Sequence, residues 1–130
     1  MQNEREMVGT CFYYDTFPKG QHLWVVLAPS VDEPNSFICV NLETKRDNSD
    51  PTCIVRQGEH PNLPKPESAV LYVFARDLPL RLISRLQTEQ RIPKMSDALL
   101  LKIQTAALTD DSKLKIKFKK AIQKYLGISS

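Results

Sequence analysis

The hydrophobic positions in the first half of the chain fall into short segments separated by polar and proline-containing turns. The segments rich in Val, Ile, Leu and aromatic residues are predicted to be strands, at residues 8–14, 23–28, 36–42, 52–56 and 70–75. The second segment is a continuous apolar run around Trp24, so we expect it to be buried on both faces. Short strands with regular turn signals and no helix between them predict a small antiparallel barrel, at least partly closed.

After residue 76 the hydrophobic spacing changes from a period of two to one of about 3.6, which is typical of helices. The start and stop signals predict three helices: one from Pro79 to before Pro93, one capped by Ser96, and one from Asp110 or Asp111 to Gly127. We therefore expect an α+β protein with a single domain over residues 1–130, in which helices of residues 78–130 pack on a barrel of residues 8–77.

The composition is that of an ordinary globular protein, with 42% hydrophobic and 25% charged residues. No apolar run approaches the roughly 18 to 20 residues of a membrane span, and the first residues carry no hydrophobic signal region, so a cytoplasmic location without membrane association is expected. Cys11, Cys39 and Cys53 match neither a disulfide framework nor a zinc site, and we expect them to be reduced and buried. The pattern predicts neither a metal site nor a cofactor.

The charge is distributed unevenly along the chain. Residues 1–75 contain ten acidic and six basic side chains, a net charge of −4, whereas residues 76–130 contain five acidic and twelve basic ones, a net charge of +7. A basic C-terminal segment can face nucleic acid or an acidic protein. It can equally be the solvated face of a helix whose lysines lie toward the helix C-terminus.

Polar residues stand near the ends of the predicted strands. They are His22, Thr44, Arg56, Glu59, His60 and Arg76. Strand ends of a small barrel can meet at one rim, where His, Glu and Arg could supply the base, the acid and the cation that RNA cleavage without a metal requires. Histidines and arginines at such positions are also common as exposed or turn-capping residues. Neither a phosphate-binding glycine loop nor a serine-hydrolase elbow is present in the sequence.

Three stretches resemble the PemK/MazF-type toxins of bacterial toxin–antitoxin systems: residues 20–27 (GQHLWVVL), 37–44 (FICVNLET) and parts of 50–72 (DPTCIV, GEHP and SAVLY). The resemblance covers roughly residues 8–77. It implies an SH3-like barrel, usually dimeric, whose active members cut single-stranded RNA without a metal and are neutralised by an antitoxin protein. In that family's pattern His22 opens the second strand and Thr44 closes the third, while the usual Arg-Pro before the second strand is replaced by Gln21 and His22.

Two hypotheses follow. In the first, the chain is a toxin-like endoribonuclease whose partners are RNA, an antitoxin and a second copy of itself. Its catalytic residues would be His22, His60, Glu59 and Thr44, and its RNA-binding residues Lys19, Arg46, Arg56 and Arg76. In the second, it is a non-catalytic SH3-like module that binds a protein or a nucleic acid through its helices and C-terminal lysines.

Overall fold

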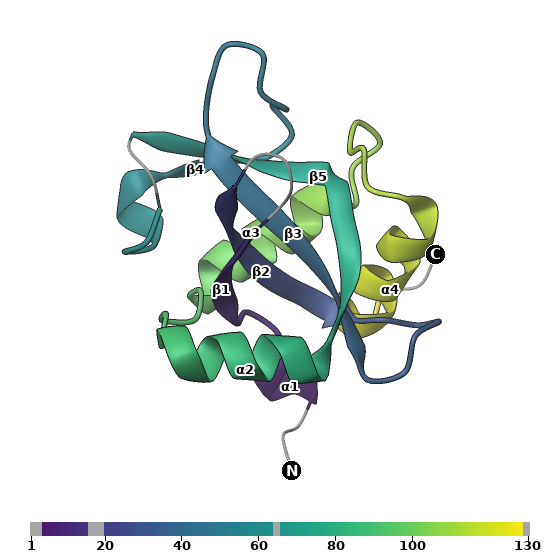
Figure 1. The fold of residues 1–130 in the computed structure, drawn as a ribbon. Coiled ribbons are helices and arrows are strands. Elements are labelled where there is room, and N and C mark those ends of the chain that lie inside the picture. The colour runs from purple at the N-terminus through teal and green to yellow at the C-terminus, as the bar shows by residue number, and fades with distance from the viewer. Residues whose placement is uncertain (1–3, 16–19, 64–65, 129–130) are drawn as a thin grey trace.

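The computed structural model describes residues 4–15, 20–63 and 66–128. A five-stranded antiparallel sheet stands at the centre, with helices on both sides (Figure 1). The strands are β1 (Cys11–Asp15), β2 (Gln21–Pro29), β3 (Ser36–Thr44), β4 (Ile54–Arg56) and β5 (Glu67–Pro79). The helices are α1 (Glu4–Met7), the 3₁₀ turn η1 (Gln57–Glu59), α2 (Leu80–Gln90), α3 (Asp97–Ala107) and α4 (Ile116–Leu126). The predicted α+β class, with three helices after the last strand, is confirmed.

The strands are ordered β1-β2-β3-β5-β4, and each neighbouring pair is antiparallel. Within the described residues β1 and β4 form the two edges and do not pair with each other, so the sheet is open and the expected barrel closure is not found. The short β4 contributes only three residues, all paired with β5. An edge of this length offers little backbone with which a sheet could close on itself.

Both faces of the sheet are buried, and alternate residues of β2 go to opposite sides. Leu23, Val25 and Leu27 belong to the cluster that includes residues of α3 and α4. Trp24 and Val26 belong to the cluster formed with α1 and α2. The prediction that 23–28 is buried on both faces is confirmed, and each large side chain buried in this way contributes about 1.5–3 kcal/mol to folding.

Two side-chain hydrogen bonds fix α3 against the sheet. The Tyr72 hydroxyl donates to the carbonyl oxygen of Ile103 at 2.7 Å, and Gln104 Nε2 donates to the carbonyl oxygen of Leu27 at 2.8 Å. Burial raises the pKa of Tyr72 far above its ordinary value. Because all these groups are satisfied within the core, their polar atoms cost little to bury there.

The helix signals are confirmed at some ends and wrong at others. Ser96 Oγ accepts a hydrogen bond from the Leu99 backbone N–H at 3.1 Å, and Gly127 ends α4 with a φ of 73°. The last helix, however, begins at Ile116, whereas Asp110 and Asp111 lie in the preceding turn. Leu114 fits the helical spacing but lies before the start of the helix, where it is buried. Its hydrophobic side chain therefore indicated a buried position and not a helical one.

Two other features extend beyond the predicted elements. The strand predicted over 70–75 is the thirteen-residue β5, which continues to Pro79 and leads directly into α2. The short α1 was not predicted, yet its Met7 is buried against the sheet. Cys11, Cys39 and Cys53 are free thiols and are buried, as expected.

Candidate active site

The start of β2 and the end of β3 meet at the same end of the sheet. The pairing of β2 with β3 ends at Leu23 and Leu42, and His22 and Glu43 are the residues that lie just beyond this last pair on the two strands. This end of the sheet therefore carries an imidazole and a carboxylate that line the same pocket.

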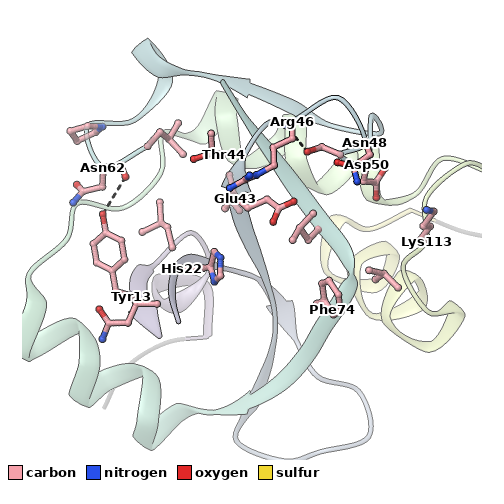
Figure 2. Close-up of a pocket in the computed structure, with 18 residues that line it drawn as sticks. Tyr13, His22, Glu43, Thr44, Arg46, Asn48, Asp50, Asn62, Phe74 and Lys113 are labelled. Atoms are coloured by element: carbon pink, nitrogen blue, oxygen red, sulfur yellow. Dashed lines mark hydrogen bonds between the residues drawn. The ribbon is translucent and has the colours of Figure 1, made fainter. Parts of the chain in front are cut away.

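A pocket of about 1110 Å³ opens at this end. Its walls are formed by β1, the strand ends of β2 and β3, the loop after β3, the loop after η1, the middle of β5 and the segment between α3 and α4. Figure 2 shows His22, Glu43 and Arg46 extending into the same space from β2, β3 and the following loop. The polar and charged side chains that line it are Tyr13, Gln21, His22, Glu43, Thr44, Arg46, Asn48, Ser49, Asp50, Asn62 and Lys113.

His22 lies at the centre of this group and is partly exposed. Its Nδ1 is buried and has no hydrogen-bond partner among the described residues. Because Nδ1 is closed off, Nε2 is the ring nitrogen that can meet a ligand in the pocket. An imidazole held in this way can exchange a proton with a bound molecule through one defined atom.

Arg46 brings a positive charge to the same pocket. Its backbone N–H donates to Ser49 Oγ at 2.8 Å, and the Ser49 N–H donates to the Arg46 carbonyl oxygen at 3.1 Å, so a tight turn holds the residue. Over the described ranges the ion pairs are Arg85 with Glu89 and Lys102 with Glu59. The exposed Arg46 guanidinium is therefore unpaired within the described part of the chain and is available to an anion.

Asp50 organises the far side of the loop. Its Oδ1 accepts hydrogen bonds from the Thr52 backbone N–H at 3.0 Å and from Thr52 Oγ1 at 2.6 Å, an Asx turn. Its Oδ2 is buried without a hydrogen-bond partner in the described residues. One oxygen of the Asp50 carboxylate therefore holds the loop in shape, and the other has no hydrogen bond within the described residues.

His60 lies outside the pocket lining and is only 4% exposed. The Asn62 backbone N–H donates to its Nδ1 at 3.1 Å, so Nε2 carries the proton that is shared with the Pro93 carbonyl oxygen at 2.8 Å. With both ring nitrogens engaged, neither is free to exchange a proton with RNA. The side chain instead joins the loop after η1 to the segment between α2 and α3.

The remaining predicted residues are spread over other surfaces. Glu59 forms an ion pair with Lys102 of α3, at 3.2 Å. Arg56 is exposed on the edge strand β4, and Arg76 holds its guanidinium 5.5 Å from the centre of the Trp24 ring. Lys19 lies outside the described residues. Of the eight predicted site residues, the pocket gathers His22, Thr44 and Arg46.

Sequence reasoning missed Glu43 in particular. It stands directly before Thr44, and it lines the same pocket as His22 because β2 and β3, two strands separated by a turn, pair with each other. The pairing could have been found by aligning the two apolar runs 23–28 and 38–42 in antiparallel fashion, because that alignment also places the flanking polar residues opposite each other. Phe74 and Lys113 come from distant segments, and no local signal indicated them.

Among the described residues, no group of three or more His, Cys, Asp or Glu side chains is placed to hold a metal ion. No helix in the described ranges has the length and apolar character needed to cross a membrane. A scan of the sequence against protein-family models gives no match, and a search of curated proteins gives no significant match.

Proposed function

We propose that this protein is a toxin-like endoribonuclease that binds single-stranded RNA in the pocket and cleaves it without a metal. The observation that supports the proposal is that His22, Glu43 and Arg46 line one pocket at the sheet end, and that Arg46 forms no ion pair among the described residues. The open sheet would then be a divergent form of the SH3-like barrel of PemK/MazF-type toxins. A cognate antitoxin and a second copy of the chain are the partners that this proposal implies.

The proposed reaction is an internal transfer at one phosphodiester. Glu43 takes the proton of the 2′-hydroxyl, O2′ forms a bond to phosphorus, and the bond from phosphorus to O5′ breaks. His22 gives the proton on Nε2 to the departing O5′. Carboxylates are ordinarily ionised at neutral pH, whereas imidazoles are divided between two states, so we assign the base to Glu43 and the acid to His22. The products are a 2′,3′-cyclic phosphate and a 5′-hydroxyl.

The other pocket residues assist at the phosphate. Negative charge grows on the non-bridging oxygens as the fifth bond to phosphorus forms, and the Arg46 guanidinium can stabilise it with two parallel hydrogen bonds. The exposed Thr44 hydroxyl lies on the same rim and can donate to a neighbouring phosphate oxygen. In this proposal His22 and Glu43 transfer protons at the sheet end, and Arg46 stabilises the charge on the phosphate from the loop after β3.

The proposal is tested by incubating the purified protein with a long single-stranded RNA in EDTA, after removal of any copurifying inhibitor. Wild-type protein should cleave the RNA, and His22→Ala should not, with unchanged circular dichroism. Cleavage that persists at the wild-type rate in His22→Ala would point to a contaminating nuclease or to another site. Absence of cleavage by the wild type would overturn the catalytic proposal.

A second candidate, a non-catalytic binding module, is favoured by the exposed lysines at and near α4. Lys115, Lys117 and Lys120 are exposed, and Lys113 reaches the rim of the pocket. If binding alone is the function, replacing Lys115, Lys117, Lys119 and Lys120 with Gln should weaken capture of the partner more than His22→Ala does. If the lysine variant captures the partner as well as the wild type does, these lysines do not bind it.

A further inference from the structure

The middle of β5 departs from regular pairing with β3. Asn41 pairs with Leu71 and Cys39 pairs with Arg76, so Val40 alone stands opposite residues 72–75 of β5. A bulge of this kind turns the extra residues out of the ladder and redirects their side chains. Tyr72 still points into the core, where it is 1% exposed, and the two residues after it are displaced toward the pocket.

The bulge leaves two large apolar side chains in solvent. Val73 is 51% exposed and Phe74 is 47% exposed, and both line the pocket. Figure 2 shows the Phe74 ring on the β5 side of the pocket, toward Lys113 and across from His22. A phenyl ring has no hydrogen-bonding group, so exposing it to water gains no hydrogen bond. An exposed ring therefore indicates a partner that contacts its apolar face.

The surroundings of Phe74 indicate what that contact is. Lys113 and Arg46 line the same pocket and are exposed, and neither takes part in the ion pairs of the described residues. An aromatic face in a pocket that also holds two cations matches an unpaired nucleotide, whose base presents a flat π surface and whose flanking phosphates are anionic. An apolar peptide would use the ring but not the two cations.

We infer that Phe74 is a stacking platform for one unpaired base of the bound strand, with Lys113 contacting a flanking phosphate. This inference rests on the proposed function, because it names how the same pocket holds its substrate. Phenylalanine offers no hydrogen bond to a base edge, so the contact selects single-stranded over paired nucleic acid and does not select a particular base. Phe74 is a positioning residue that sets the distance of the strand from His22 and Glu43.

The test measures binding separately from cleavage. The probe is a fluorescently labelled single-stranded oligonucleotide whose 2′-hydroxyls are replaced by fluorine, so that the internal transfer cannot occur. Phe74→Ala should weaken its binding by roughly 5- to 100-fold, whereas Phe74→Trp should bind as tightly as the wild type or more tightly. Leu101→Ala removes an equally exposed apolar side chain, 50% exposed on α3 and outside the pocket, and should leave binding unchanged.

Each outcome separates this inference from the proposed function. If the wild type cleaves RNA and Phe74→Ala binds the probe like the wild type, stacking is overturned and the endoribonuclease stands. If Phe74→Leu retains full affinity, the contact is merely apolar, which overturns stacking and favours a protein segment on the patch. Binding that depends on the ring without any cleavage supports the inference and removes the catalytic proposal. A wild type that neither binds nor cleaves overturns both.

Discussion

The side-chain amide of Gln90 forms two hydrogen bonds with the backbone of Tyr13, as a neighbouring strand would. The Tyr13 N–H donates to Gln90 Oε1 at 2.7 Å, and Gln90 Nε2 donates to the Tyr13 carbonyl oxygen at 2.8 Å. β1 is an edge strand, so no strand in the described part of the chain lies beside these backbone groups. The last residue of α2 thus covers part of an edge that would otherwise be open to pairing with another chain.

Replacing Gln90 with Ala should therefore destabilise the fold by about 1–3 kcal/mol, because two partly buried backbone groups lose their partner. Urea unfolding followed by circular dichroism measures this change. Thr88→Ala, exposed in the same last turn of α2, is the matched control and should have little effect. Equal stability of the two variants would mean that water replaces the amide at no cost.

Glu43→Gln should reduce RNA cleavage by about 10²- to 10⁴-fold, because the amide keeps the shape of the side chain but cannot take the 2′-hydroxyl proton. Glu59→Gln is the control, since that carboxylate forms a surface ion pair with Lys102 outside the pocket. Single-turnover cleavage of a labelled RNA gives both rates. A similar loss in the two variants would argue against Glu43 as the base.

Arg46→Ala should slow cleavage and weaken binding of the RNA, and it should lower the dependence of affinity on salt by roughly one phosphate contact. Arg56→Ala is the matched control, because Arg56 is exposed on β4 and does not line the pocket. Binding titrations at several salt concentrations measure the slope. If Arg56→Ala changes the salt dependence of affinity and Arg46→Ala does not, the RNA strand binds along β4 and not in the pocket.

The two histidines should respond oppositely to replacement. His60→Ala should lower the midpoint of unfolding, because it leaves the Asn62 N–H and the Pro93 carbonyl oxygen without their buried partner. His22→Ala should abolish cleavage without loss of stability, because His22 Nδ1 has no hydrogen-bond partner among the described residues. Thermal unfolding and cleavage are measured on both proteins. If His60→Ala is as stable as the wild type and no longer cleaves RNA, His60 takes part in catalysis.

Stability should fall in alkali, through the buried thiols and Tyr72. Burial raises the pKa of Cys11 to about 12 and raises the pKa of Cys39 and of Tyr72 well above their ordinary values. In the unfolded chain these groups lose their protons near their ordinary pKa, so the unfolded state binds fewer protons above about pH 9. The stabilisation is complete below that pH and is lost as the pH rises toward 12.

Urea unfolding at pH 8, 9.5 and 10.5 measures this loss. Each buried thiol contributes up to about 1.4 kcal/mol per pH unit over that window. Cys39→Ala should show a shallower decline than the wild type, since Cys39 is completely buried. The same slope in both proteins would mean that the thiol ionises in the folded state.

The sequence predicted the strands and helices well where the hydrophobic pattern was long and regular. The run around Trp24 and the cap at Ser96 are local signals, and both are confirmed. The start of α4 was misplaced because Asp110 resembles an N-cap, whereas the turn before Ile116 is set by burial of Leu114. The sequence around a helix end identifies residues that can cap a helix. It does not show which of them lies at a helix start, because that depends on which neighbouring residues are buried in the folded protein.

The candidate site was predictable in part for a similar reason. His22, Thr44 and Arg46 were found because each follows or opens a strand, and strand ends meet in a folded sheet. His60 carried the same kind of signal, but its position is set by a carbonyl group thirty-three residues away. Phe74 gave no signal at all, because an aromatic residue in a strand is ordinarily predicted to be core, and only the bulge turns it outward.

The bulge in β5 also bears on how this protein can diverge. It lies between two regularly paired halves of the strand, one beside β3 and β4 and the other leading into α2. A residue inserted or removed at Val73 or Phe74 changes the wall of the pocket, while the alternation of side chains in each half is kept by its own pairing. Related chains can therefore acquire pockets of different width and reach here on an unchanged hydrophobic core.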